Sequence, residues 1–211
     1  MKRLAMKHST TSGGAIVPGY FRYAGALAAV LLLGGCVSLG GKAPKQLIGL
    51  TPEHAAPAGD LGGAALRDAL VVVDPETDRR LDVQRVPVQV DGATIAYLKD
   101  VSWVERPARL FRRLLAETIR ARGKRLVVEG GEVSESGKVT LGGRLLDMGY
   151  DARSRSVVVR FDALRSDGAG NVVSRRFEAT VEGVAPKADA VAPALNKAAN
   201  DVAGQVADWM G

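Results

Sequence analysis

Cys36 is the residue of this 211-residue chain whose type and setting most clearly point to covalent chemistry. It is the single cysteine, so its sulfur has no partner for an intramolecular disulfide. Gly34 and Gly35 come directly before it, and small residues let an extended chain enter a narrow protease site. The Cys36 thiol is a nucleophile of the kind needed to accept a diacylglyceryl group.

The residues before Cys36 have the order of a secretory signal segment. A basic start is followed by an apolar run over residues 24–33, which is shorter than the roughly 20 apolar residues that span a bilayer. The run ends in Leu33-Gly34-Gly35-Cys36, which resembles the lipobox of bacterial lipoproteins. We therefore predict a signal segment over residues 1–35, for which a start at Met6 would serve as well as one at Met1.

The lipobox resemblance implies cleavage between Gly35 and Cys36. It also implies a diacylglyceryl group on the Cys36 sulfur and an N-acyl chain, such as palmitate, on the new amine. The alternative is a buried apolar helix with an incidental cysteine. The order of positive charge, apolar run, small residues and cysteine favours the lipoprotein signal.

Other chemistry has little support in the composition. His54 is the one histidine after Cys36, and it has no cysteine beside it for a zinc site and no triad pattern. Four of the 29 basic residues and none of the 23 acidic residues precede Cys36, which leaves 25 basic residues and a net charge of about +2. We therefore expect no metal, no cofactor beyond the covalent lipid, no nucleic-acid partner and no enzymatic activity.

Residues 36–68 are rich in Gly, Ala and Pro, which predicts a lipidated tether. An apolar island over 46–52 interrupts this segment, and it is a candidate short strand or an apolar patch of the linker. Residues 69–211, where regular hydrophobic patterns begin, form the predicted domain.

Alternating or continuous apolar residues in seven segments predict about six strands in this domain. The Asp91-Gly92 pair predicts a hairpin with a two-residue turn, and Pro87 predicts an edge or a bulge. Gly142 and Gly143 inside a strand predict a bulge or a close backbone approach. The predicted strands are 69–74, 86–90, 94–98, 125–129, 139–148, 156–164 and 172–184.

Two amphipathic helices are predicted. Residues 106–122 have apolar side chains on one face, Pro107 in the first turn and Gly123 after the end. Residues 189–210 repeat apolar residues at helical spacing, and Pro193 sets their start near Asp189. The economical fold is α+β, a mixed or mostly antiparallel sheet of five to six strands with both helices packed on it, and the alternative is a three-layer α/β/α arrangement.

The segment Val101 to Pro107, which contains Trp103, leads directly into the apolar pattern of residues 110–115. This order resembles the strand–Trp–Pro–helix pattern of ABC-type transport auxiliary lipoproteins, a family that includes the lipoprotein of the paraquat-inducible system. Val104 departs from the pattern, because a small residue is more usual after the tryptophan. Residues 47–52 are similar to the family's opening strand and residues 189–209 to its closing helix, so the resemblance covers most of the chain after Cys36.

The resemblance implies a compact sheet with helices and a non-catalytic role beside an ABC permease and ATPase. The periplasmic subunit of such systems carries the mammalian-cell-entry (MCE) domain, and the systems move phospholipids, sterols or other apolar molecules. The lipoprotein would tether or complete the periplasmic conduit. Val37 stands where an aspartate would favour the inner membrane, so we expect the inner leaflet of the outer membrane, facing the periplasm. An envelope-assembly lipoprotein that partners an outer-membrane barrel or a lipopolysaccharide exporter is the alternative.

A candidate partner or lipid surface surrounds the first helix. Trp103 precedes it, and Arg109, Arg112 and Arg113 lie on it within a run of basic residues that suits anionic headgroups or an acidic partner. The alternatives are packing for Trp103 and an ordinary solvated helix face for the arginines.

Overall fold

The computed structural model describes residues 46–59, 68–123, 125–130 and 138–211, within a compact unit that spans Pro44–Gly211. The predicted signal segment 1–35 and Cys36 lie outside the described residues. The elements are β1 (Gln46–Ile48), β2 (Leu70–Val72), β3 (Glu76–Thr77), β4 (Pro87–Gln89), β5 (Ile95–Tyr97), β6 (Val101–Trp103), α2 (Pro107–Ala121), β7 (Val127–Glu129), β8 (Val139–Asp151), β9 (Ser156–Ser166), β10 (Val172–Val181) and α3 (Ala188–Met210).

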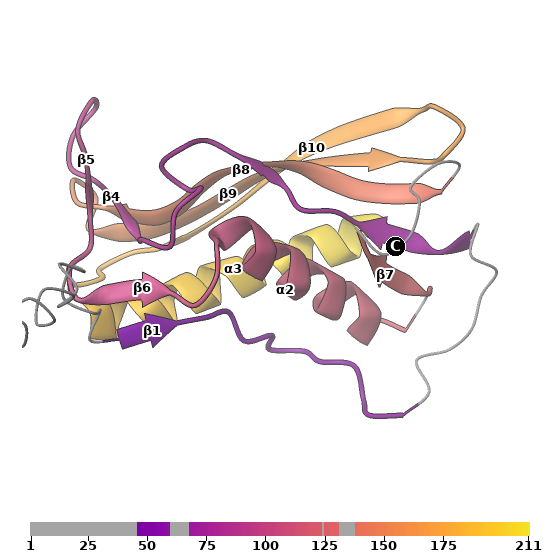
Figure 1. Ribbon diagram of the computed structural model, residues 1–211, viewed down its shortest axis with the longest axis horizontal. Helices are drawn as coiled ribbons and strands as arrows, with labels where there is room; N and C mark the ends of the chain where they lie inside the picture. Colours follow the sequence, from indigo (N-terminus) through magenta and orange to yellow (C-terminus); the bar gives the residue numbers. More distant parts are fainter. Residues whose placement is uncertain (1–45, 60–67, 124, 131–137) are drawn as a thin grey trace, which may run out of the picture. The chain divides into compact units, whose positions relative to one another are not determined.

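Three long antiparallel strands, β8, β9 and β10, form the largest part of the sheet (Figure 1). Phe161 on β9 faces Leu145 on β8 and Phe177 on β10. Because successive side chains of a strand point to opposite faces, this register places one apolar row of each strand on the same side. That side holds the buried core, to which Val157 and Val159 also belong.

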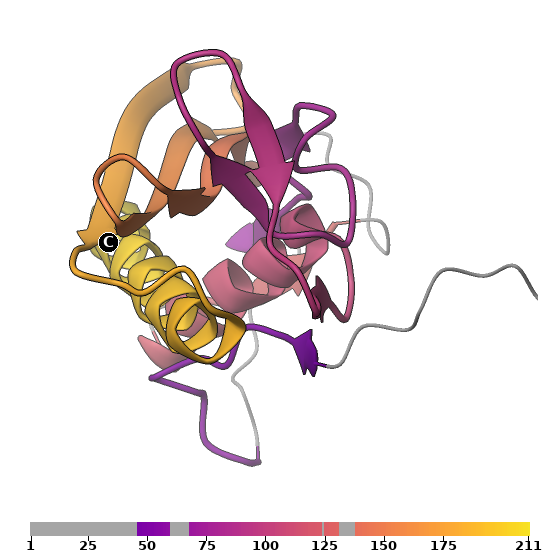
Figure 2. The ribbon, with the colours of Figure 1, turned by 90° about the vertical axis from the view of Figure 1, so that its left-hand side faces the viewer.

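Both helices cover this apolar face, α2 beside α3, and the sheet curls around them (Figures 1 and 2). The rings of Phe111 on α2 and Phe161 on β9 meet edge to face, with centroids 5.2 Å apart. The predicted α+β class and the two amphipathic helices are confirmed. Because both described helices lie on one face, the two-layer arrangement forms and the three-layer alternative does not.

The sheet has more strands than predicted, because one edge of β8 is paired by short pieces. In the described residues eight strands share this sheet, in the order β10-β9-β8-β2-β7, with β3, β4 and β5 attached. Leu70 of β2, Glu76 of β3 and Val88 of β4 pair in parallel with successive positions of β8. Four of the short strands, β2, β4, β5 and β7, lie within predicted segments, whereas β3 has two residues and is too short to show a period in the sequence.

The helix ends lie close to the predicted positions. Pro107 is the first residue of α2, where its missing N–H breaks no helical bond. Gly123 follows the end with φ +65°, the left-handed conformation that glycine adopts without strain. In α3, Pro193 lies early enough that only the carbonyl of Asp189, in the first turn, loses a helical donor.

The hairpin β4–β5 has a longer turn than predicted. The amide of Val90 donates to the carbonyl of Thr94 at 3.0 Å, so three residues rather than two connect the strands. The Asp91 carboxylate closes this loop by accepting the amides of Ala93 and Thr94 at 2.8 and 2.7 Å. Pro87 is the first residue of β4, and β5 rather than β4 is the outer strand.

Residues 46–59 belong to the folded unit, and of the two alternatives for the island at 46–52 within the predicted tether, the short strand is the one that forms. β1 pairs in parallel with β6 in a separate two-stranded sheet, and Ile48 is buried in the core. The chain after β1 then crosses α3, where the Asn196 carboxamide oxygen accepts the amide of Thr51 at 2.8 Å. The island at 46–52 was thus a strand followed by a docked segment.

Asn200 holds this segment by two hydrogen bonds and makes a third within its own helix. Its carboxamide oxygen accepts the amide of Glu53 at 2.8 Å, and its nitrogen donates to the carbonyls of Thr51 and Asn196, both at 2.9 Å. The side chain is buried, at 7% exposure. Because removing it leaves buried backbone groups unpaired, we expect Asn200→Ala to lower the free energy of unfolding by about 2 kcal/mol.

Urea denaturation and hydrogen exchange at the Glu53 amide would measure this loss. The matched control is Lys197→Ala on the same helix, whose side chain is exposed and forms an ion pair with Asp201. We expect the control to change neither stability nor exchange. Unchanged Glu53 protection in Asn200→Ala would contradict the assignment.

Candidate functional site

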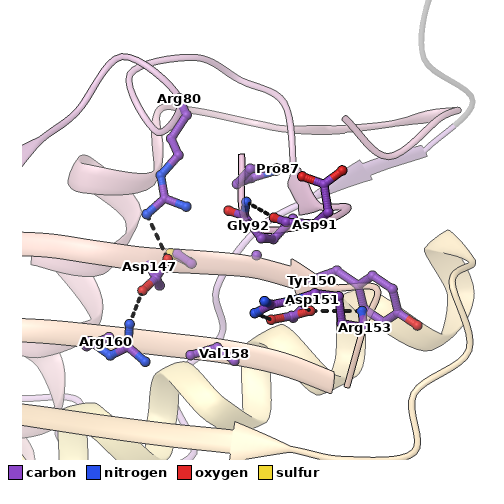
Figure 3. A pocket seen from close by; sticks show the side chains of 13 residues that line it. Arg80, Pro87, Asp91, Gly92, Asp147, Tyr150, Asp151, Arg153, Val158 and Arg160 are labelled. Atoms are coloured by element: carbon purple, nitrogen blue, oxygen red, sulfur yellow. Dashed lines mark hydrogen bonds and ion pairs between the residues drawn. The ribbon is translucent and has the colours of Figure 1, made fainter. Parts of the chain in front are cut away.

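A cavity of about 350 Å³ lies on the outer face of the sheet, opposite the helices, between the β4–β5 hairpin and strands β8 and β9 (Figure 3). Gly149 permits the approach of β4, because a Cβ there would lie 2.5 Å from the carbonyl oxygen of Pro87. The lining residues are Arg80, Pro87, Gln89, Asp91, Gly92, Asp147, Met148, Gly149, Tyr150, Asp151, Arg153, Val158 and Arg160.

A β-bulge in β8 brings Asp147 to this face. The register against β9 shifts between Leu145 and Asp147, which leaves Leu146 without a partner. Leu145 and Met148 both point into the core, so the alternation changes phase at the bulge and Asp147 points outward. The free carbonyl of Leu146 accepts a hydrogen bond from the Arg80 guanidinium at 2.5 Å.

Asp147 joins two arginines from separate parts of the chain. One carboxylate oxygen accepts Arg80 at 2.7 Å and the other accepts Arg160 at 2.5 Å (Figure 3). Arg160 extends the chain of charges to Glu178 on β10, with its Nε 2.5 Å from the carboxylate. Four alternating charges therefore cross three strands of the outer face. Such a network fixes side chains more firmly than isolated surface pairs do.

The other two carboxylates of the cavity are held at turns. Asp151 accepts the backbone amide and the guanidinium of Arg153, at 2.9 and 3.0 Å. The Arg153 side chain lowers the pKa of Asp151, and the amides of Ala93 and Thr94 lower the pKa of Asp91. Both carboxyls stay ionised at neutral pH and have no proton to donate.

The cavity is suited to hold charged groups rather than to transfer protons. Its lining has three arginines and three aspartates, and no Ser, Cys, His or Lys is among the lining residues described. A ligand with both charges could contact both sets of side chains. The described His, Asp and Glu side chains also form no group of three that would hold a metal ion.

The ion pairs of the outer face predict a dependence of stability on pH. The Arg176 guanidinium holds the pKa of Asp162 below its ordinary 3.8, and Arg160 holds the pKa of Glu178 below its ordinary 4.5. A carboxyl with a lowered folded pKa stabilises fully above its unfolded pKa, and the effect is lost as pH falls through the folded pKa. We expect stability to be level between about pH 7 and 5 and to decrease below about 4.

Urea denaturation at a series of pH values would measure this profile. Asp162→Asn removes one titrating carboxyl, so the variant should lose less stability on acidification than the parent. Parallel profiles for the two proteins would show that this ion pair does not contribute to folding.

Trp103 lies in the core rather than at the surface. Its side chain is 1% exposed, and its indole nitrogen has no hydrogen-bond partner in the described residues. It therefore packs beneath α2 from the end of β6 and presents no surface to a partner.

The three predicted arginines of α2 do not form a free positive patch. Arg112 lies 3.4 Å from Asp74 and 3.2 Å from Glu129, and Arg113 lies 3.0 Å from Glu105. Arg109 makes no ion pair with another described residue. Three more arginines of this region, Arg106, Arg120 and Arg122, pair with Asp82, Glu117 and Asp208.

No signal in the sequence marked the cavity. Arg80, Asp147 and Arg160 come from a loop and two strands, and only the β8 bulge brings them together.

Gly35, Cys36 and Lys124 lie outside the described residues. Within the described ranges, no helix has both the length and the apolar content needed to cross a bilayer.

Residues 50–207 match the family model described as ABC-type transport auxiliary lipoprotein component. Comparison with curated proteins gives no match. Among solved structures, protein XCC0632 from Xanthomonas campestris, of family DUF330, is 16% identical, with a TM-score of 0.61 over 80% of this chain and 93% of its own. A protein described only as uncharacterized is 14% identical, with a TM-score of 0.62 over 80% of this chain and 100% of its own.

A further solved structure, the PelC dodecamer from Paraburkholderia phytofirmans, is 16% identical with a TM-score of 0.39, over 69% of this chain and 90% of its own. The first two structures share the fold of this chain. The family model covers well over half of the chain and nearly all of the described domain. The chain therefore belongs to the family of ABC-type transport auxiliary lipoprotein components.

Proposed function

We propose that the protein is a lipid-anchored, non-catalytic component of an ABC transport system whose periplasmic subunit carries an MCE domain. The family match over residues 50–207, joined to the Leu33-Gly34-Gly35-Cys36 motif, carries this proposal. Phospholipids or sterols are the proposed cargo class. The domain would stand on the inner leaflet of the outer membrane and tether or complete the conduit.

The short distance between the anchor and the fold supports a membrane-adjacent domain. β1 begins at Gln46, ten residues after Cys36. A fully extended chain spans at most about 3.6 Å per residue, so the start of β1 lies within roughly 36 Å of the anchoring cysteine. A site on this domain would therefore work close to one membrane rather than across the whole periplasm.

The paired carboxylates of the outer face support a non-catalytic role. Asp151 and Asp91 are held ionised by their hydrogen bonds, and Asp147 is bound by two guanidiniums. General acid catalysis needs a carboxyl that carries a proton at the working pH. This arrangement instead supplies fixed charges for recognition.

Crosslinking in intact cells, followed by purification of the full chain, tests the proposal. We expect an MCE-domain subunit together with its permease and ATPase. The matched control is an unrelated domain fused to residues 1–45, which should recover none of them. Recovery of an outer-membrane barrel without any ABC component would instead establish the envelope-assembly alternative.

A further inference from the structure

Strand β10 forms an open edge of the main sheet. Among the described strands it pairs with β9 alone, through ten consecutive residue pairs without a bulge, and most of its residues are exposed (Figure 1). An edge strand of this length presents unpaired N–H and C=O groups to any extended chain beside it. The regular register keeps these groups in line over the whole strand.

Two hydrogen bonds fix the directions of the backbone groups along β10. The carbonyl of Asn171 points toward β9, and the carbonyl of Glu178 points away from it. The Asn171 carbonyl accepts the Asp167 amide across the turn, and the Glu178 carbonyl accepts the Gln205 side chain of α3 at 3.3 Å. Because alternate residues of an antiparallel pair direct both backbone groups outward, Ser174 and Arg176 point outward like Glu178. α3 thus covers the edge at Glu178, and no other described residue bonds the outward groups of Ser174 or Arg176.

Two arginines near this edge, Arg175 on β10 and Arg165 on β9, have no carboxylate partners in the described residues. The Arg175 guanidinium lies 5.2 Å from the Phe177 ring centroid, and the Arg165 guanidinium lies 5.4 Å from that of Trp209. The two rings are themselves 5.6 Å apart. Stacking on an aromatic face fixes a guanidinium while its N–H groups stay available to an anion.

Apolar side chains beside these arginines are exposed. Val172 and Val173 are 61% and 46% exposed, and Leu164 on β9 is 44% exposed. The β9–β10 register puts Val172 and Leu164 on the outer face and Val173 and Arg175 on the inner face. A strand added here would therefore meet an apolar patch on one face and a free arginine on the other.

We propose that the edge of β10 from Val172 to Arg176 binds an extended segment of a partner protein in which acidic and apolar residues alternate. The acidic side chains would lie opposite Arg175 on the inner face, where directly opposed residues are about 5 Å apart. A second copy of this chain fits less well, because pairing β10 with β10 would bring arginines together. This inference stands apart from the proposed function, since it requires no particular transport system.

The first test uses the full lipidated protein in non-ionic detergent and an eight-residue synthetic peptide that alternates glutamate with valine. Fluorescence anisotropy should show saturable binding, at least tenfold tighter than for the same peptide with lysine in place of glutamate. Arg175→Glu should weaken binding at least tenfold. Arg144→Glu, the same charge change on the outer face of β8, should leave it unchanged.

The backbone contribution is tested at Ser174, whose amide faces outward. Ser174→Pro removes that donor without breaking the pairing with β9, and should weaken peptide binding at least tenfold, whereas Ser174→Thr should not. Equal affinity for the two peptides, or full binding by Ser174→Pro, would overturn the proposal. A photocrosslinker at Ser174 in cells should link to a different protein, and chain-to-chain products would overturn it in favour of a second copy.

Discussion

Replacing Cys36 with serine is expected to abolish palmitate incorporation and to release the domain from membranes. One acyl chain gives only marginal and reversible membrane binding, whereas two or more hold a protein stably, at about 0.8 kcal/mol per buried methylene. Since the chain has one cysteine, no other thiol can accept the lipid. Metabolic labelling and fractionation would measure both effects, and the mass of the parent should show a mature chain that starts at a triacylated Cys36.

The release is measured with residues 1–35 replaced by a signal that the general signal peptidase cleaves. Otherwise the uncleaved apolar run at 24–33 could hold the variant in the membrane. Val37→Asp is the matched control, because it should keep the lipid and change only which membrane carries the protein. A Cys36→Ser variant that stays in the membrane fraction after signal cleavage would disprove the anchor.

The helices could be predicted closely because their signals are local. An apolar stripe, Pro107 at the start and Gly123 after the end fix α2 to within one residue at each side. Strand β9 was equally visible, since Val157, Val159 and Phe161 recur at alternate positions. In these elements, residues that are close together in the sequence are enough to predict the secondary structure.

The short strands and the cavity depend on contacts between distant residues. The sequence left residues 46–52 as either a strand or a linker patch, and the pairing of β1 with β6, more than fifty residues later, decides between them. Gly142 and Gly143 predicted either a bulge or a close approach; Gly143 makes the close approach, and the bulge lies at Leu146, an ordinary residue. No local sequence pattern predicts this bulge, although the bulge determines that Asp147 faces the cavity.

The two faces of the sheet have different roles in the domain. Apolar residues of β8 and β9 bind the helices on one face, while ion pairs link the strands on the other. Ion pairs at a solvated face contribute modestly to stability, so the fold depends mainly on the buried face and on the fit of β8 against β9. Gly143, where a side chain on β8 would meet the backbone of β9, is therefore a position at which we expect substitution to be poorly tolerated.

Gly143→Ala is expected to lower the free energy of unfolding by about 3 kcal/mol or more. The residue has φ +131°, a conformation that other residues adopt only with strain of about 1–3 kcal/mol. A Cβ would also overlap the carbonyl oxygen of Asp162 and lie 3.0 Å from the Cα of Ala163. Relief requires that β8 and β9 separate at their centre, which disturbs the core beneath them.

Two other glycines separate these causes. Gly170 has φ +102° and no atom within 4 Å of the point where a Cβ would lie, so Gly170→Ala should show the backbone strain alone, about 1–2 kcal/mol. Gly92 has neither a positive φ nor a near neighbour, so Gly92→Ala should leave stability unchanged within about 0.5 kcal/mol. Urea denaturation of residues 44–211 would rank the three variants. If Gly143→Ala and Gly170→Ala lost the same stability, the close contact between β8 and β9 would add nothing to the strain, and the sheet would tolerate a side chain at its centre.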